Sequence, residues 1–591
     1  MRQLLGLLIL GSALIPAIAV AQEQSPSLKI AYPPASHQTV YDKIFFIGTA
    51  PVAGQVLVNG NVVKRSPAGH FAPSFPLQLG ENVFNIRYQN QDVQIKVVRT
   101  ANQPVIPAGL AFAKDSLTPA VDVAKLAGEP TCFSAVAAPN STVSVKLGNI
   151  NIPLGAQPPQ AQLPASNAVL TGQNQPIAQA GMSKYEGCTS IDATEKNLDL
   201  GKPEFQLTQN SKTTTQLGTG QITILSPNQL QVAEVTTDAG VARTGASTDY
   251  SRLTPLPKFT RAAIIGREGE WLQLAYGGWI NSKETKTLPA GTVPPRAIIR
   301  SVSYRKLADR TEMVFPLSAA IPVTIQQGSN TFSLTLHNTT AQTDVIRLDD
   351  NPLISRLDWE QVSPGKVQYT FNLKKNQQWG YKLRYEGTSL VLSLRHPPTL
   401  VGKGRKPLTG IKVLVDAGHG GKESGAPGPS GIFEKDINLT VSKLVQAELV
   451  KLGATVVMTR EDDRDVSLVD RMAKIDREEP VLSVSIHYNS LPDNGDLEKT
   501  KGVGVFWYNT QAHSLALFMQ KHLVQQLQRP SYGVFWNNLA LTRPTAAPSV
   551  LLELGFVTNP NEFEWVTNAA EQKKLARSIA QGIYEWLQRV Q

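Results

Sequence analysis

The sequence predicts a multidomain protein in which all-β modules precede one C-terminal α/β domain. The chain has 591 residues, which is too long for one hydrophobic core at about 150 residues per domain. Before residue 400, apolar residues alternate with polar ones at a period of two, which is typical of strands. From Ile411 onward, apolar runs alternate with helical patterns, which indicates α/β layers.

The start of the chain predicts a secretory signal peptide over residues 1–21. Arg2 is positively charged, an apolar run follows from Leu4, and Ala19-Val20-Ala21 forms a small-residue cleavage site. The alternative is an uncleaved membrane anchor, but the run is short for a bilayer span. No cysteine marks a lipoprotein, and no later apolar run is long enough to cross a membrane. We expect an exported protein of the periplasm or cell wall.

The net charge is +10, and a basic protein is attracted to polyanions. Nucleic acid is one such polymer, and the anionic polymers of a cell wall are another. Because we expect export, nucleic acid is excluded as a partner. Peptidoglycan and other anionic wall polymers are the expected partners.

The chain contains two cysteines, Cys132 and Cys188. In an oxidising compartment, an even number of cysteines favours a disulfide. Two unpaired buried thiols are the alternative. The two residues are too far apart, and lack the flanking ligands, for a metal site.

Residues 28–100 predict an all-β sandwich. Apolar residues alternate at Ile44 and Phe46 and again at Val93 and Ile95, and turn signals such as Asn59-Gly60 separate the runs. The segment resembles the immunoglobulin-like (Ig-like) modules found beside many extracellular enzymes.

Residues 101–228 are rich in Ala, Pro, Gln, Ser and Thr. This composition predicts either a low-complexity linker or a second, looser β module that is crosslinked by a disulfide between Cys132 and Cys188. Few apolar anchors occur between Leu154 and Ala180, where we expect a flexible loop.

Residues 229–286 are compact and carry the apolar run from Trp271 to Ile280. The segment resembles a bacterial SH3 domain, a small barrel often attached to cell-wall hydrolases. Trp271 and Trp279 could form a wall-binding face or belong to the core of the barrel. We expect core positions, because aromatic side chains in small β domains usually pack inward.

Residues 297–397 alternate again, as at Val367, Tyr369 and Phe371. They resemble the AMIN domain, a β module that localises enzymes to the wall in the periplasm. Prolines and glycines then predict a linker over residues 398–410.

Residues 411–591 predict the α/β domain. The expected strands are Ile411–Val415, Thr455–Met458, Val481–Ile486, Val503–Trp507 and Val550–Leu554. The expected helices are 436–452, 467–478, 511–528 and 569–589.

Polar residues that suit catalysis follow three of these strands. His419 follows the first strand, His487 follows the third, and Glu553 lies near the end of the last. Sites in α/β sheets gather at the carboxyl ends of strands. Glu434 precedes a helix expected to begin near Asp436.

Each residue alone has a plain structural explanation. His419 could lie in a surface turn, His487 could be a satisfied core histidine, and Glu434 is a favourable acid at a helix N-terminus. Glu553 is harder to explain, because a carboxylate buried in Val-Leu-Leu-Glu-Leu is costly unless it is paired or close to a metal. All four residues fall in one domain, which favours a functional site.

The residues around these four extend the pattern. The matching segments are 416–421, Glu434, 467–471, 485–490 and 548–559. With these segments, residues 411–589 resemble the zinc-dependent N-acetylmuramoyl-L-alanine amidases of the amidase-3 family.

The resemblance implies that His419, Glu434 and His487 bind Zn²⁺, with water in the fourth position. Zinc lowers the pKa of bound water to about 7 and polarises the amide carbonyl. Glu553 is then the general base. The bond cleaved joins N-acetylmuramic acid to L-alanine of the stem peptide in peptidoglycan.

Asp416 and Asn489 are candidates to orient the ligands from behind. The alternative for both is turn stabilisation, for which Asp and Asn are well suited.

Some members of this family carry an inserted helix that plugs the zinc site until an activator removes it. Here Gly502 to Tyr508 passes almost directly into the helix expected near Gln511, and only Asn538 to Pro548 precedes the last motif. We therefore expect no plug, and expect control by location through the β modules.

Two other functions are compatible with parts of the pattern. A glycoside hydrolase could use Glu434 and Glu553 as its carboxylate pair, but it leaves both histidines unexplained. A non-catalytic wall-binding scaffold would not need the intact set of four residues.

Overall fold

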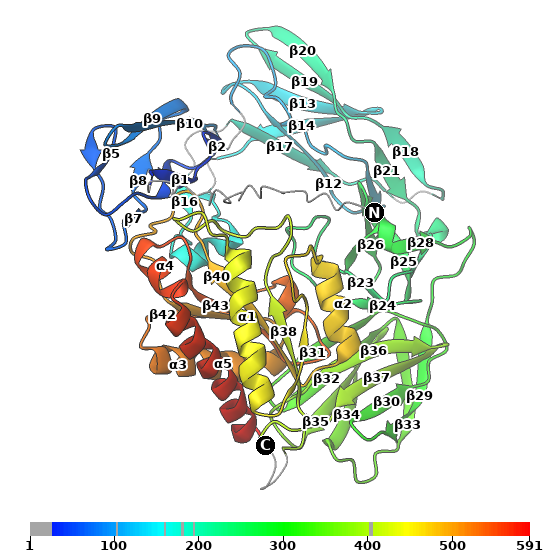
Figure 1. Ribbon diagram of the computed structural model, residues 1–591. Helices are drawn as coiled ribbons and strands as arrows, with labels where there is room; N and C mark the ends of the chain where they lie inside the picture. Colours follow the sequence, from blue (N-terminus) through cyan, green and yellow to red (C-terminus); the bar gives the residue numbers. More distant parts are fainter. Residues whose placement is uncertain (1–26, 102–104, 159–160, 179–182, 193–194, 401–405) are drawn as a thin grey trace, which may run out of the picture.

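The computed structural model describes residues 27–101, 105–158, 161–178, 183–192, 195–400 and 406–591 (Figure 1). The expected signal peptide, residues 1–21, lies outside the described residues. Among the described helices, none combines the length and apolar content needed to cross a bilayer.

Residues 27–100 form three small sheets around one apolar core that includes Phe46, Phe71 and Ile86. The alternating pattern accounts for this arrangement, because every second side chain of a strand faces the same side. The strands are β1 (Lys29–Tyr32), β2 (Ser36–Thr39), β3 (Lys43–Phe45), β4 (Ile47–Thr49), β5 (Val56–Val58), β6 (Asn61–Val62), β7 (His70–Phe71), β8 (Ser74–Pro76), β9 (Gly80–Tyr88) and β10 (Gln91–Arg99).

Residues 105–228 are a second β module rather than a linker. Six strands form one sheet in the order β12-β17-β14-β13-β19-β20, and Cys132 on β12 is bonded to Cys188 on β17. The strands are β11 (Val123–Leu126), β12 (Thr131–Val136), β13 (Thr142–Leu147), β14 (Ile150–Ala156), β15 (Ala161–Gln162), β16 (Ile177–Ala178), β17 (Lys184–Thr189), β18 (Leu198–Gly201), β19 (Glu204–Gln209), β20 (Lys212–Leu217) and β21 (Ile222–Leu225). The flexible loop expected between Leu154 and Ala180 contains β15, β16 and the 3-10 helix Ser166–Thr171.

Residues 229–288 share a sheet with that module. In the order β18-β21-β11-β25-β22-β28, β11 pairs with β21 on one side and with β25 on the other. The sheet therefore crosses the domain boundary expected between residues 228 and 229. The strands of the segment are β22 (Val232–Val235), β23 (Ala239–Gly240), β24 (Leu256–Pro257), β25 (Arg261–Glu268), β26 (Trp271–Leu274), β27 (Trp279–Asn281) and β28 (Thr285–Thr287).

The two tryptophans of this segment differ in burial. Trp279 is buried, as expected for a core residue, whereas Trp271 is partly exposed. The guanidinium of Arg243 lies 6.0 Å from the centre of the Trp271 ring. The core position expected for Trp271 is therefore wrong.

Residues 297–395 form two sheets that enclose a single core, which includes Phe315, Phe332 and Tyr369. One sheet has the order β33-β29-β30-β37-β36 and the other β31-β32-β35-β34. The strands are β29 (Ala297–Lys306), β30 (Arg310–Phe315), β31 (Val323–Gln327), β32 (Thr331–His337), β33 (Thr339–Ile346), β34 (Ile354–Ser363), β35 (Lys366–Leu373), β36 (Tyr381–Glu386) and β37 (Ser389–Arg395).

The C-terminal domain is built on a six-stranded sheet in the order β39-β38-β40-β43-β41-β42. The strands are β38 (Lys412–Ala417), β39 (Thr455–Met458), β40 (Leu482–Asn489), β41 (Val503–Trp507), β42 (Ser531–Trp536) and β43 (Ser549–Phe556). The first four strands in this order run parallel, and β41 is antiparallel to β43. Their near-continuous apolar runs suit a sheet that is covered on both faces.

Helices cover both faces of this sheet. The helices are α1 (Glu434–Lys451), α2 (Leu468–Glu478), α3 (His513–Leu527), α4 (Pro560–Val566) and α5 (Ala569–Arg589). On β38, Val413 and Val415 belong to the core that contains Ile437 and Val441 of α1, whereas Leu414 packs with Ile475 of α2. This alternation places α1 and α2 on opposite sides of the sheet.

The expected elements of this domain were found, and two short ones were missed. β42 and α4 were not expected from the sequence. The domain also begins before Ile411, because Leu408, expected in the linker, is fully buried in the core of the domain.

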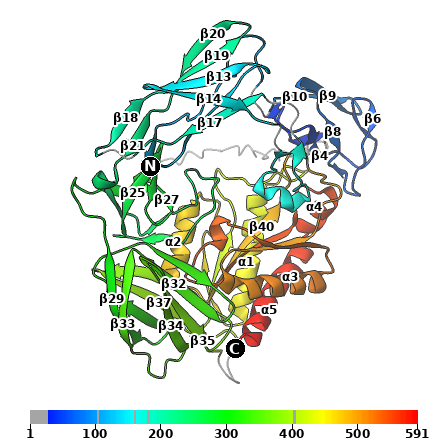
Figure 2. The same ribbon diagram turned by 180° about the vertical axis from the view of Figure 1, so that it is seen from behind.

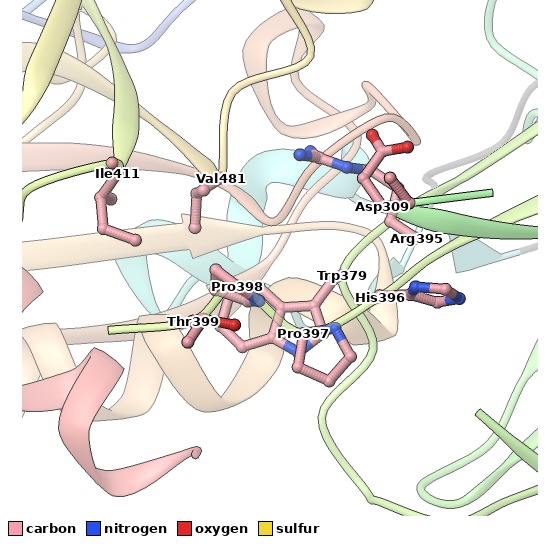
Figure 3. A pocket seen from close by; sticks show the side chains of 11 residues that line it. Asp309, Trp379, Arg395, His396, Pro397, Pro398, Thr399, Ile411 and Val481 are labelled. Atoms are coloured by element: carbon pink, nitrogen blue, oxygen red, sulfur yellow. The ribbon is translucent and has the colours of Figure 1, made fainter. Parts of the chain in front are cut away.

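The β modules contact the C-terminal domain at more than two places. Leu170 and Gln173 contact it through Tyr532 and Asn494, and two further contacts can be followed in Figures 1 and 2. Residues 27–100, drawn in blue, lie beside α4, and residues 297–395, drawn in green, lie by the opposite end of the sheet. Trp379 joins the core of the C-terminal domain, with its ring 5.4 Å from that of Trp586. A cavity of about 260 Å³ lies at the interface between residues 297–395 and the C-terminal domain (Figure 3). Its lining includes Asp309, Trp379 and Arg395 on one side and Ile411 and Val481 on the other.

Candidate metal centre and active site

Three predicted residues meet at one end of the C-terminal sheet. The Nε2 atom of His419 lies 3.1 Å from one carboxylate oxygen of Glu434. The Nδ1 atom of His487 lies 3.0 Å from the other oxygen. One ligand atom from each of the three residues lies within 4.8 Å of the others. Two imidazoles and a carboxylate form a donor set suited to a metal ion.

The topology of the sheet accounts for this meeting. β38 and β40 are parallel neighbours, and Ala417 of β38 pairs with Ile486 of β40. His487 and Glu553 occupy paired positions on the parallel strands β40 and β43. The carboxyl ends of these strands therefore bring side chains that are far apart in the sequence to one edge.

His419 lies in a turn with an uncommon backbone conformation. Its φ is +58°, in the left-handed region that L-residues adopt rarely. Arg471 supports the turn, because its Nη2 atom donates a hydrogen bond of 2.6 Å to the carbonyl of His419. The backbone that carries this ligand is thus held by a residue of α2.

Glu434 is the first residue of α1 and is 4% exposed. Its carboxylate accepts hydrogen bonds of 3.1 Å from Ala426 N, Tyr488 N and Asn438 Nδ2. Burial alone would raise the pKa of Glu434, but the two histidines outweigh burial and hold that pKa well below its usual range. The position at a helix N-terminus also favours the negative charge. Glu434 is therefore ionised and fixed in place, as a metal ligand requires.

Two glycines allow the ligands to approach one another. A Cβ atom added at Gly418 would lie 2.3 Å from the imidazole of His487. One added at Gly425 would lie 2.5 Å from Oε2 of Glu434 and 2.7 Å from the ring of His419. The side chains of the three candidate ligands fill the space that a larger residue would occupy.

The three residues fit a zinc ion. With zinc–ligand bonds of 2.0–2.1 Å and tetrahedral geometry, ligand atoms lie about 3.3 Å apart. The separations of 3.1 Å from His419 Nε2 to Oε2 and 3.0 Å from His487 Nδ1 to Oε1 reach different oxygens of Glu434. One of them corresponds to a ligand–ligand edge when a single oxygen of Glu434 binds zinc. Three protein ligands leave one position of a tetrahedron for water or substrate, as in catalytic zinc sites.

Glu553 lies beside this cluster in a cavity of about 410 Å³. The cavity is lined by His419, Gly425, Ala426, Glu434, His487, Tyr488, Asn489, Ser490 and Glu553. The Oε2 atom of Glu553 is buried and has no hydrogen-bond partner among the described residues. Burial, and then the nearby charge of Glu434, raise the pKa of Glu553 well above its usual value. A carboxyl group of this kind is suited to accept and return a proton.

Asp416 acts from behind the ligands. It is fully buried, forms a 2.6 Å ion pair with Arg471 and accepts a hydrogen bond from Ser485. Because Arg471 also holds the carbonyl of His419, Asp416 is linked to the ligand turn through one residue. Asn489 lines the cavity, but its side-chain oxygen accepts a hydrogen bond from the backbone of Ser490, which is a turn contact.

Sequence reasoning missed the supporting residues Arg460, Asn438 and, except as part of a matching segment, Arg471. Arg460 donates to the carbonyls of Ala417 and Gly418. These residues carry no motif spacing of their own. Arg460 and Asn438 act largely through backbone carbonyls and through Glu434, so no sequence pattern indicates their role.

Residues 413–585 match the model of the family described as N-acetylmuramoyl-L-alanine amidase. The "uncharacterized protein YqiI" of Bacillus subtilis is 37% identical over 182 residues, which span 30% of this chain and 85% of YqiI. The "probable cell wall amidase LytH" of Staphylococcus aureus is 33% identical over 183 residues, or 31% of this chain. The match spans 60% of the length of that LytH.

Solved structures match the same part of the chain. One is the N-acetylmuramoyl-L-alanine amidase AmiC2 of Nostoc punctiforme, which is 32% identical to this chain over the matched residues. The match covers 31% of this chain and 99% of AmiC2, with a TM-score of 0.29. Another is the catalytic domain of CwlV, an amidase from Bacillus (Paenibacillus) polymyxa, with 31% identity, 31% and 99% coverage, and a TM-score of 0.29.

Proposed function

Because the chain belongs to the N-acetylmuramoyl-L-alanine amidase family through its C-terminal domain, we propose that it is a zinc-dependent peptidoglycan amidase. The bond cleaved is the amide between N-acetylmuramic acid and L-alanine. One observation carries the proposal: His419, Glu434 and His487 converge beside the cavity that contains the unpartnered carboxyl oxygen of Glu553.

The roles of the residues follow from their chemistry. His419, Glu434 and His487 hold Zn²⁺, which when bound supplies a Lewis acid that polarises the amide carbonyl and acidifies water. Glu553 accepts the proton of the attacking water and returns it to the departing amine of L-alanine. Asp416 and Arg471 keep the turn of His419 in place, as residues behind metal ligands commonly do.

In this proposal, the β modules that precede the C-terminal domain bring the enzyme to the cell wall. The Ig-like, SH3-like and AMIN-like segments are binding modules for the wall, and the protein is exported through its signal peptide to the periplasm or cell wall. Its net charge of +10 attracts it to the anionic polymers found there. Control by location then replaces control by a plugging helix.

The test is digestion of purified peptidoglycan by the mature full-length protein. New free L-alanine amines should appear, disappear with a chelator and return with Zn²⁺. New reducing sugars in their place would overturn the proposal in favour of a glycosidase acting through Glu434 and Glu553.

A second arm of the experiment tests the general base. Glu553→Gln should bind zinc with unchanged stoichiometry while kcat falls by a factor of about 10²–10⁴, the usual contribution of a general base. Metal content and kcat are measured on the same preparation. A Glu553→Gln protein with full turnover would show that the proton is taken elsewhere.

A further inference from the structure

The loop that joins β40 to β41, residues 490–502, begins at the wall of the metal cavity. Asn489 and Ser490 line the cavity, and the chain then turns at Pro492 to Gly495. The conformation of this loop therefore sets the position of one wall of the substrate site. The residues that hold this loop in place therefore affect substrate binding.

The far half of the loop is held by the C-terminal domain itself. Asn559, which caps α4, donates hydrogen bonds of 2.7 Å to the carbonyl of Leu497 and 3.1 Å to that of Thr500. The carboxylate of Glu562 accepts a hydrogen bond from the backbone of Gly502. These contacts lie away from the cavity wall.

The near half of the loop is held by residues 27–100. The carboxylate of Asp493 accepts a hydrogen bond from the hydroxyl of Tyr32 and lies 3.0 Å from Nε2 of His37. The rings of Tyr32 and His37 are in edge contact at 5.3 Å. His37 and Asp493 are 19% and 13% exposed, so the contact is largely shielded from water. Tyr32, His37 and Asp493 are referred to as the clasp.

An apolar cluster lies next to the clasp. Phe45, Ile47 and Ala72 of the N-terminal module pack with Leu491, Leu497 and Phe556 of the C-terminal domain. These six side chains are at most 9% exposed. Two surfaces that bury such side chains against each other are docked rather than loosely tethered.

The same module reaches the other side of the cavity. Lys29 donates a 2.8 Å hydrogen bond to the carbonyl of Ser430, four residues before Glu434. His70 makes an edge contact at 5.1 Å with Phe563 of α4, and the backbone of Ala68 donates to Glu564. Residues 27–100 thus bridge the two loops that flank the metal site.

We propose that Tyr32, His37 and Asp493 are positioning residues for the amidase reaction. Through the clasp, residues 27–100 hold Asn489 and Ser490 in the conformation that binds the peptidoglycan stem peptide. Residues 27–100 then contribute to substrate binding as well as bringing the enzyme to the cell wall. This inference rests on the proposed amidase function, and it concerns substrate binding rather than the proton transfer at Glu553.

The experiment compares full-length His37→Ala, Tyr32→Phe and Asp493→Asn with the wild type on a soluble muropeptide. Tyr32→Phe removes only a hydroxyl and keeps the packing of the ring. We expect KM to rise about tenfold and kcat to change less than about twofold, the pattern of lost substrate binding. Zinc stoichiometry should not change. Arg87→Ala is the matched control, because Arg87 lies in the same module in an exposed pair with Asp92.

Hydrogen exchange supplies a second measurement that does not depend on activity. Amides of residues 490–496 should exchange faster in the three clasp variants, and those of the module core, such as Ile86 and Ile95, should not. Faster exchange throughout residues 27–100 would mean that the variants unfold the module. In that case Tyr32→Phe alone decides the question.

The outcomes are separable. A wild-type protein without amidase activity would overturn the proposed function, and this inference with it. An active wild type whose clasp variants keep their KM, or cleave faster, would overturn only the positioning role. Faster cleavage would identify the docked module as an inhibitor.

Discussion

At the scale of single residues, the candidate metal site requires glycine at positions where a Cβ atom would meet the candidate ligands. Gly425 has a φ of +66°, and the position that a Cβ atom would take is already occupied by Glu434 and His419. Because Glu434 is held by three further hydrogen bonds, it cannot move aside without losing them.

We therefore expect Gly425→Ala to lose zinc affinity by a factor of about 10–100, the range seen when the supports of metal ligands are altered. Gly387→Ala is the matched control, since its φ is +63° and no atom of the described residues lies within 4 Å of the added atom. Both variants carry the same backbone strain, so competition with a zinc-sensitive dye isolates the effect of the clash. Equal zinc affinities in the two variants would contradict the close packing around Glu434.

At the scale of elements, α2 is joined to β38 by one buried ion pair. Asp416 of β38 is fully buried, and Arg471 of α2 is 3% exposed. Burying a charge is costly unless its partner is present. The helix therefore does more than cover the sheet, because Arg471 neutralises the charge of Asp416 beneath the candidate metal ligands.

Arg471→Met should lower the free energy of unfolding of the C-terminal domain by about 3–5 kcal/mol, since it leaves Asp416 uncompensated. Urea unfolding followed by tryptophan fluorescence measures the change. Arg477→Met on the same helix is the control, because Arg477 is exposed and its nearest carboxylate lies 3.7 Å away. The double change Asp416→Asn with Arg471→Met should recover part of the loss, and no recovery would mean that packing rather than charge is responsible.

Elements with a strong apolar period could be predicted from the sequence. β39 and β41 were predicted with the bounds that the structure has, and the four long helices to within two residues. β42 was missed because Gly533 and the flanking Pro530 interrupt its pattern, and α4 because seven residues are too few to show a helical period.

Three of the four residues of the candidate site could be named from their places at strand ends, and Glu434 from its place before a helix. Their roles came from the resemblance to the amidase family. Arg460 could not be given a role, because it acts through backbone carbonyls that any sequence would supply.

At the scale of the whole molecule, residues 297–395 are docked on the C-terminal domain through charge as well as through Trp379. Glu479 lies between Arg310 and Lys382 of the β domain. Burial alone would raise the pKa of Glu479, but its two cationic partners outweigh burial and lower that pKa to about 2.

The docking of this domain should weaken in acid. A carboxyl group whose pKa is lowered in the docked state stabilises that state above its ordinary pKa of 4.5, and the contribution is lost as pH falls from about 4.5 to about 2. Small-angle scattering from pH 6 to pH 2.5 should show an expansion in this window. Glu479→Gln should be partly expanded already at pH 6 and lose this pH dependence. An identical pH response in wild type and variant would assign the expansion to other groups.

The modules could be located from the sequence, but their contacts could not. Composition and period describe each segment alone, whereas Trp379 is buried by residues of another domain some two hundred positions later in the chain. Likewise, nothing in the sequence pattern of Asp493 indicates that Tyr32 and His37 are its partners.

The sheet that joins β11 to β25 has a consequence for how this protein could have been assembled by gene rearrangement. A rearrangement that moved only residues 229–288 would leave Arg267 and Glu268 of β25 without their partners on β11, and unpaired backbone groups at a sheet edge favour pairing with other chains. A fragment that keeps this sheet whole therefore has to include both segments, residues 105–288.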